Sequence, residues 1–197
     1  MADSGSQNAT LEHIQDLMRL PLAAHWSAKD SFCNLELEGL GFALLFEASW
    51  IWREPGVGNA HGVSADARWS RLTSSLDLAR WEASWAGNAG NAEARNTPAQ
   101  FPGSLLADPE HAFFAGSAGN EIIAGGIANR TGSVVGLSNI FVNSGDVIAV
   151  WTELINRAGH AFPGLPLVGY ERGSALEAAL ACGFKVIGPL RVWARRD

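Results

Sequence analysis

The chain has 197 residues, of which 47% are hydrophobic and 17% charged, and its formal net charge is −6. This length predicts one domain, and the charged share, below the usual value of about 25%, argues against a disordered chain. The negative charge and the lack of a basic stripe exclude nucleic acid as the expected partner. No apolar run is long enough to span a membrane. The first residues do not resemble a signal peptide, so we expect a cytoplasmic protein.

The first hundred residues predict two helices, two strands and a long loop. Apolar side chains alternate from Leu40 to Trp52, which is typical of a strand with one buried face. Thr10 can cap the first helix, and Ser74 or Ser75 can cap the second. The loop is rich in Gly, Asn and Pro, and is either a boundary between two halves or a flap over a site. The expected ranges are 10–20, 40–52, 67–72, 75–85 and 87–103.

The second half predicts the order β-β-β-α-β-α-β. Short turns of Gly and Asn join the first three strands, which favours an antiparallel meander. Ser144 or Asp146 can cap the next helix, with Gly159 past its end, and Gly183 ends the last helix. The expected strands are 111–117, 121–128, 133–142, 165–170 and a strand pair over 185–195 bent at Pro189, and the last helix spans 175–182.

This order resembles the C-terminal two-thirds of the GCN5-related N-acetyltransferase (GNAT) fold. Leu137–Val142 resembles the central fourth strand of that family, Leu167–Tyr170 resembles the fifth, and Ala175–Phe184 resembles the Ala-rich helix that ends in Gly-Phe. The resemblance covers about residues 105–195, and residues 1–100 match only in the order of elements. It implies an α/β (α+β) fold in a single domain over 1–197, with a mixed, mostly antiparallel sheet that joins both halves and is flanked by helices.

The resemblance also implies an acyl-CoA-dependent N-acetyltransferase that acts on an amine of a small molecule. Acetyl-CoA is the co-substrate in this family, and it binds where the fourth and fifth strands separate. The pantetheine follows the fourth strand, and the pyrophosphate meets backbone N–H groups at the start of the next helix, which can bind an anion. The implied binding residues are Ile140, Phe141 and Val142 for the pantetheine, and Ser144, Gly145, Asp146 and Val147 for the pyrophosphate.

The chain departs from the family pattern at two positions. The family's pyrophosphate loop, Arg/Gln-x-x-Gly-x-Gly/Ala, is replaced by Asn143–Val150, in which Asp146 adds a negative charge. Many members carry a Tyr five residues before the Phe of the Gly-Phe corner, and here that position is Ala179. Both departures favour an alternative: a catalytically silent GNAT-fold protein that binds a small ligand or a partner.

Glu171 and Tyr170 are the candidate catalytic residues. They end a predicted central strand, where open sheets present their ligands. Glu171 can take a proton from an attacking amine, directly or through water, but it can also act as a structural cap or form a salt bridge with Arg172 or a neighbouring Arg. Tyr170, the chain's only tyrosine, can act as a donor there.

No covalent intermediate or metal is expected. Cys182 should pack inward as a neutral thiol, so the amine would attack the thioester directly. The five histidines never fall three or four residues apart, which argues against a metal site. Eight tryptophans favour a filled core over an aromatic-lined pocket, and Trp50 and Trp52 should be either both buried or both in one cavity. The acceptor, the acyl length and the oligomeric state, including a homodimer, stay open.

Overall fold

A computed structural model of the protein describes residues 4–19, 26–56, 67–87 and 99–195. The strands form one mixed, mostly antiparallel sheet in the order β1-β8-β2-β7-β6-β5-β4-β3, with helices flanking it. This arrangement confirms the expected fold class. The helices are α1 (Ser4–Met18), α2 (Ser75–Trp85), α3 (Val147–Ala161) and α4 (Gly173–Ala181), and the strands are β1 (Ser27–Asp30), β2 (Phe42–Arg53), β3 (Arg68–Arg71), β4 (His111–Ala118), β5 (Glu121–Thr131), β6 (Val134–Val142), β7 (Leu167–Glu171) and β8 (Lys185–Arg195).

The chain divides into two compact units. The first comprises residues 1–51, 170–176 and 186–197, and the second comprises residues 52–169 and 177–185. Within the described ranges, no helix is both long and apolar enough to cross a membrane. Most of the predicted loop at 87–103 lies outside the described residues.

In the first unit, a helix and three strands enclose a small core. β1 pairs antiparallel with β8, from Ser27 opposite Ala194 to Asp30 opposite Arg191. The buried Asp30 carboxylate accepts hydrogen bonds from the backbone N–H groups of Phe32 (3.2 Å) and Leu35 (3.0 Å), which compensates its burial and fixes the turn after β1. The core residues are Ile14, Leu35, Leu37, Phe42 and Trp193.

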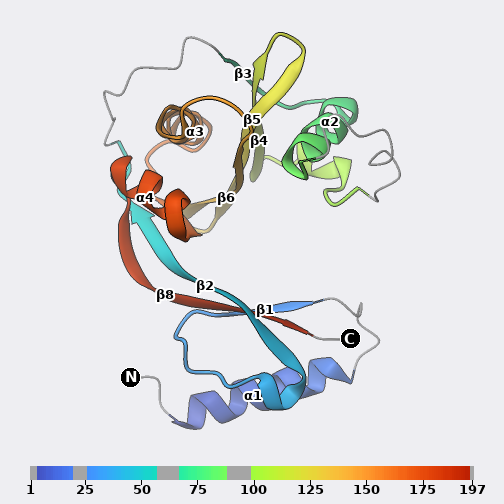
Figure 1. Cartoon of the computed structure of the whole chain (residues 1–197), viewed down its shortest axis with the longest axis vertical. Coiled ribbons are helices and arrows are strands. Elements are labelled where there is room, and N and C mark those ends of the chain that lie inside the picture. The colour runs from blue at the N-terminus through green and yellow to red at the C-terminus, as the bar shows by residue number, and fades with distance from the viewer. Residues whose placement is uncertain (1–3, 20–25, 57–66, 88–98, 196–197) are drawn as a thin grey trace. The chain divides into compact units, whose positions relative to one another are not determined.

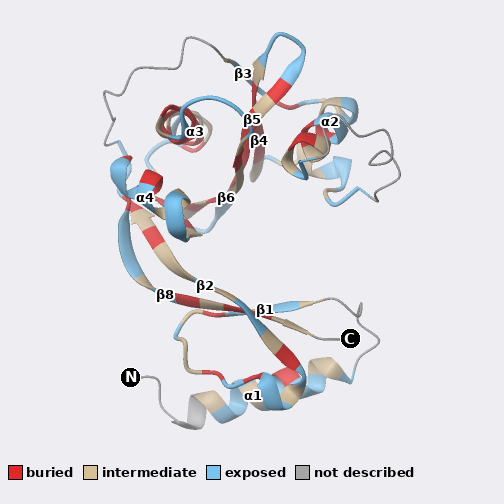
Figure 2. Ribbon diagram, viewed as in Figure 1, coloured by how far each residue is buried: buried red, intermediate tan, exposed pale blue. Residues whose placement is uncertain are grey.

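In the second unit, the antiparallel meander β4-β5-β6 lies between two helices. Figure 1 shows α2 and α3 on opposite faces of these strands. The turns contain Gly119 and Gly132 at φ 59° and 60°, a left-handed conformation that glycine adopts without strain. The two faces of the meander and the inner side of α3 carry most of the buried residues of this unit (Figure 2). The meander and the order that follows it agree with the prediction.

The adjacent glycines of β5 allow both helices to approach the sheet closely. A Cβ atom at Gly125 would lie 2.8 Å from the carbonyl oxygen of Phe114 and would collide with the indole nitrogen of Trp81 from α2. A Cβ atom at Gly126, on the opposite face, would lie 3.0 Å from Leu154 Cδ1 of α3. Successive strand residues point to opposite faces, so the pair leaves room for one helix on each side.

Several elements differ from the predictions. The helix α1 begins at Ser4 and not at Thr10, and the Gln7 side chain holds its first part by donating to the carbonyl of Asn34 at 2.7 Å. The helix α3 continues through Gly159 to Ala161. The predicted strand pair at 185–195 is the single strand β8, whose pairing with β1 begins at Arg191, two residues after Pro189.

The long strand β2 does not have the fully buried face that the alternation predicts. Phe42, at its start, is buried in the core beside α1, whereas Leu44 is 44% exposed. Trp50 and Trp52 are both half-buried. The strand β1 was not predicted, because Ser-Ala-Lys-Asp has no apolar alternation.

The first testable prediction concerns the close approach at Gly125. Gly125→Ala should lower the free energy of unfolding by about 1–3 kcal/mol, because the added methyl group overpacks the contact with Trp81. Urea unfolding followed by tryptophan fluorescence measures this change. The matched control is Gly159→Ala in α3, where a Cβ atom would have no neighbour within 4 Å and should stabilise the helix by up to about 1 kcal/mol. Equal stability of the two variants would contradict the close approach.

Candidate functional site

The strand β6 carries a β-bulge where the residues begin that the family resemblance assigns to the pantetheine. Gly125 of β5 faces Phe141 and Ile127 faces Ser138, so two residues of β6 face the single Gly126. One of the two, Asn139, has φ 52°, a left-handed conformation that asparagine tolerates better than most residues. A bulge bends the strand and redirects its backbone groups. Ile140 to Val142 therefore follow a course that regular pairing would not give them.

The strands β6 and β7 pair only at their beginnings. The parallel pairs are Val135 with Leu167 and Gly136 with Val168. Among the described residues of this unit the pairing ends there, although β6 continues to Val142. Strands that stop pairing leave backbone N–H and C=O groups for another partner. The predicted separation of these two strands is thus present in the second unit.

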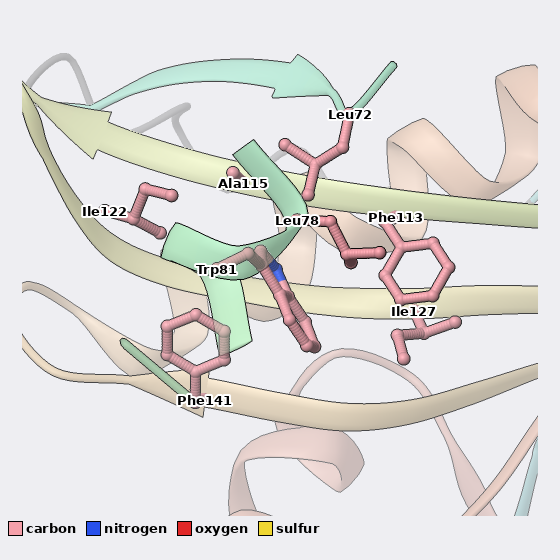
Figure 3. Close-up of a cluster of buried hydrophobic side chains, with 8 residues drawn as sticks. All are labelled: Leu72, Leu78, Trp81, Phe113, Ala115, Ile122, Ile127 and Phe141. Atoms are coloured by element: carbon pink, nitrogen blue, oxygen red, sulfur yellow. The ribbon is translucent and has the colours of Figure 1, made fainter. Parts of the chain in front are cut away.

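A buried hydrophobic cluster packs against the end of β6 (Figure 3). The indole of Trp81 on α2 is fully buried and packs edge-on against Phe141 of β6, with ring centroids 5.3 Å apart. The indole N–H donates to the carbonyl oxygen of Phe114 at 2.9 Å, which satisfies its only polar group. Leu72, Leu78, Phe113, Ala115, Ile122 and Ile127 complete the cluster. Phe141, a predicted cofactor-binding residue, therefore directs its side chain into the core, and only its backbone is available to a ligand.

The loop after β6 leads into α3 through an aspartate cap. Asp146 is the N-cap residue, and its carboxylate accepts a hydrogen bond from the backbone N–H of Ile148 at 2.9 Å. This is the capping role predicted for Ser144 or Asp146. Gly145 has φ 103°, which excludes most other residues there. The first turn of a helix offers free N–H groups, but here one of them is occupied and a carboxylate stands beside the others.

The loop also has an anchor that sequence did not reveal. The side-chain amide of Asn143 donates to the carbonyl of Ser84 near the end of α2 at 3.0 Å, and its backbone N–H donates to the carbonyl of Ile123 at 2.7 Å. Ser144, Gly145, Asp146 and Val147 are all exposed. The four predicted pyrophosphate residues are thus accessible to solvent. They directly follow Asn143, which is anchored through both its side chain and its backbone.

Tyr170 and Glu171 end β7 and belong to the first unit. The ring of Tyr170 packs edge-on against Trp50, with centroids 5.5 Å apart, and the ammonium of Lys29 lies 4.6 Å from the Tyr170 centroid. Burial raises the pKa of Glu171 to about 7. Arg172, the predicted salt-bridge partner, instead lies over the ring of Phe46, at 4.7 Å from its centroid.

Glu171 forms no ion pair or hydrogen bond with any residue that the structure describes. The structural alternative, a cap or a salt bridge with Arg172 or a neighbouring Arg, thus has no supporting contact among the described residues. A carboxyl group that titrates near neutral pH and has no structural partner is suited to proton transfer.

Ala179 and Cys182 are both fully buried in the second unit. The Cys182 sulfur lies 3.8 Å from the Thr152 hydroxyl and 3.7 Å from the Ile148 carbonyl oxygen, and burial raises the pKa of the thiol. This inward packing agrees with the prediction of a neutral thiol. In the part of the chain that the structure describes, no three His, Cys, Asp or Glu side chains gather as metal ligands would.

The predicted site residues thus fall into two sets. Ile140 to Val147 are contiguous in the second unit, and Tyr170 and Glu171 lie together in the first. Sequence reasoning missed Asn139, which shapes the end of β6. An asparagine within an apolar strand, opposite a glycine pair, is a signal that could have indicated the bulge, because asparagine is depleted in strands and tolerates left-handed backbone.

Solved structures of low sequence identity share this fold. A conserved protein of unknown function from Staphylococcus epidermidis superposes with a TM-score of 0.71 at 12% identity, covering 100% of this chain and 82% of that one. A putative acetyltransferase of the GNAT family from Novosphingobium aromaticivorans gives 0.56 at 12% identity, covering 100% and 83%. A GCN5-related N-acetyltransferase from Sphaerobacter thermophilus gives 0.58 at 14% identity, covering 95% of this chain and 65% of that protein.

These similarities establish the GNAT fold of the chain. No family model matches the sequence, and no curated protein sequence matches it either. At identities of 12–14% the likeness concerns the fold, and function depends on the residues of the site.

Proposed function

We propose that the protein is an N-acyltransferase that moves the acetyl group of acetyl-CoA to an amine of a small molecule. The GNAT fold and the separation of β6 from β7 support the binding of the acyl donor. The observation that carries the catalytic part is the carboxyl group of Glu171, which has no partner among the described residues and whose pKa burial raises to about 7. A general base works best when its pKa lies near the working pH.

The proposed donor site follows β6 and the loop after it. The pantetheine would pair with the backbone of Ile140, Phe141 and Val142, beyond the bulge, where β7 no longer pairs with β6. The pyrophosphate would meet the N–H groups from Ser144 to Val147, at the positive end of the α3 dipole. The strand β6 suits the acyl donor better than the loop after it does, because the carboxylate of Asp146 in the loop repels the negative charge of the pyrophosphate.

The proposed reaction is direct attack of the amine nitrogen on the thioester carbonyl carbon. A C–N bond forms, the C–S bond breaks, and coenzyme A leaves as its thiolate. Glu171 would take the proton from the attacking nitrogen, directly or through a water molecule. The thiolate would receive a proton from Tyr170 or from water, since Ala179 stands at the position where many members of the family have a tyrosine.

The competing proposal is a silent GNAT-fold protein that binds a small ligand or a partner. The carboxylate of Asp146 in the loop and the buried Ala179 favour it. Calorimetric titration of the full chain with acetyl-CoA, followed by a coenzyme A release assay over a panel of amines, separates the two. Saturable donor binding with amine-dependent release supports transfer, and failure of every amine despite ligand binding supports the silent protein.

Substitution of Glu171 tests the proposed base. Glu171→Gln should lower the turnover by about 10²- to 10⁴-fold, while the affinity for acetyl-CoA stays close to that of the wild type. The base acts when deprotonated, so the wild-type rate should rise with pH through about 7 and level off above it. The variant should lack this inflection. Glu177→Gln, on the exposed side of α4, is the matched control and should keep the wild-type profile. Full activity of Glu171→Gln would remove Glu171 from the mechanism.

Substitution of Asp146 tests the proposed pyrophosphate position. Asp146→Asn should tighten coenzyme A binding by a factor of about 2–5, because it removes a negative charge and keeps a side chain that caps helices equally well. Asp146→Ala, the control, also loses the cap and should lower the thermal stability. Calorimetric titration at low and high salt measures the coenzyme A affinity of both variants. The gain in affinity of Asp146→Asn should shrink as the salt concentration rises. Weaker or unchanged binding in Asp146→Asn would contradict this placement.

Substitution of Cys182 tests direct transfer. Cys182→Ala should retain the turnover of the wild type, because the buried thiol with a raised pKa is a poor nucleophile. Intact-mass spectrometry of the wild type with acetyl-CoA alone should show no acetylated protein. An acetyl adduct that is lost together with activity in Cys182→Ala would establish a covalent intermediate in place of direct attack.

A further inference from the structure

A cavity of about 260 Å³ lies in the second unit, away from the proposed acyl-CoA positions. The end of β2, the second half of α3 and the start of β7 line it, with Arg53, Ile155, Asn156, His160, Leu165 and Leu167 among the contributing residues. The acyl-CoA candidates lie at the other end of α3, around its N-cap Asp146. The cavity is therefore separate from the proposed donor site.

Arg53 is a buried cation whose hydrogen-bonding capacity is mostly unused. The residue is only 3% exposed, and its Nε–H donates to the carbonyl oxygen of Cys182, at the end of α4, at 3.0 Å. Its Nη2 is buried and has no hydrogen-bond partner, and no carboxylate among the described residues pairs with its charge. A guanidinium has five N–H donors and stays protonated. The bond to Cys182 explains why Arg53 is held in place, but leaves the terminal nitrogens unpaired.

Apart from Arg53, the lining of the cavity is mostly apolar, and its polar side chains are those of Asn156 and His160. Ile155, Leu165 and Leu167 supply aliphatic surface. The imidazole of His160 is fixed by its Nδ1–H, which donates to the backbone carbonyl of Asn156 at 2.6 Å. Because a carbonyl can only accept, Nδ1 carries the proton and Nε2 is left for a second interaction.

We propose that this cavity binds a small organic acid, whose carboxylate pairs with the terminal nitrogens of Arg53 and whose apolar body contacts Ile155, Leu165 and Leu167. A planar carboxylate matches the two Nη groups of a guanidinium and can accept from both at once. Such a ligand supplies both the counter-charge and the acceptors that Arg53 lacks. Pockets of this kind, apolar with a few fixed polar groups, are typical of small-molecule sites.

Titration of the full-length protein with matched probes tests this proposal. The acids are benzoate and 4-methylpentanoate, and the controls are their primary amides and inorganic phosphate. Both acids should bind saturably in calorimetry and raise the thermal unfolding temperature, and the amides should bind at least tenfold more weakly. Equal binding of acid and amide, preference for phosphate, or no saturable binding of either acid would overturn the proposal.

Two variants locate the binding. Arg53→Met should weaken benzoate binding by about 10- to 100-fold, the range expected for a lost charge-assisted hydrogen bond. Because this change also removes the bond to Cys182, Gly159→Leu serves as a second variant. Gly159 lines the cavity and a Cβ atom there meets nothing within 4 Å, so a leucine fits at the cavity wall and favours the helix. Gly159→Leu should fold and should lose benzoate binding, and retained affinity in this folded variant would place the acid elsewhere.

Discussion

The architecture of the second unit depends on the absence of side chains at Gly125 and Gly126. Trp81 of α2 contacts the backbone of β5 on one face, and Leu154 of α3 does so on the other. Any larger residue would move one of the helices away from the sheet. The same Gly126 stands opposite the two bulge residues of β6, and a Cβ atom there would lie 3.4 Å from Ile140 Cγ1. The same glycine pair therefore permits both the close packing of the helices and the bulge of β6.

This constraint extends to the candidate site through Phe141. Its ring packs edge-on against Trp81, which fixes the backbone of β6 just after the bulge (Figure 3). The next segment is held by Asn143, which bonds to Ser84 of α2. Residues on rigid elements position a ligand more accurately than residues on free loops. A ligand along Ile140 to Val142 would thus meet a backbone whose position is set by α2, far away in sequence.

The sequence allowed the prediction of the elements whose signals are local. The meander could be predicted because Gly-Asn turns and apolar runs alternate over short distances, and the cap at Asp146 follows from one residue and its position. For the bulge at Asn139 the only local signal was an asparagine within an apolar strand, because the bulge itself depends on the residue opposite in β5. Burial of Arg53 was inaccessible, since its partner Cys182 lies 129 residues away. Alternation along β2 predicted a buried face that exists only at Phe42, because periodicity indicates which residues share a face but not what covers it.

Two charged side chains show how the fold treats buried charge in opposite ways. Asp30 accepts two backbone N–H bonds within its own turn, so its burial is compensated and it serves structure alone. Glu171 has no such donors among the described residues, and its burial raises its pKa to about 7. A raised carboxyl pKa means that the folded state binds the proton more tightly than the unfolded chain does. Stability from this group is therefore complete below the unfolded value near 4.5 and is lost as the pH rises to about 7. An uncompensated carboxylate lowers stability at the pH where a general base must be ionised, and the proposed role of Glu171 in proton transfer would account for that cost.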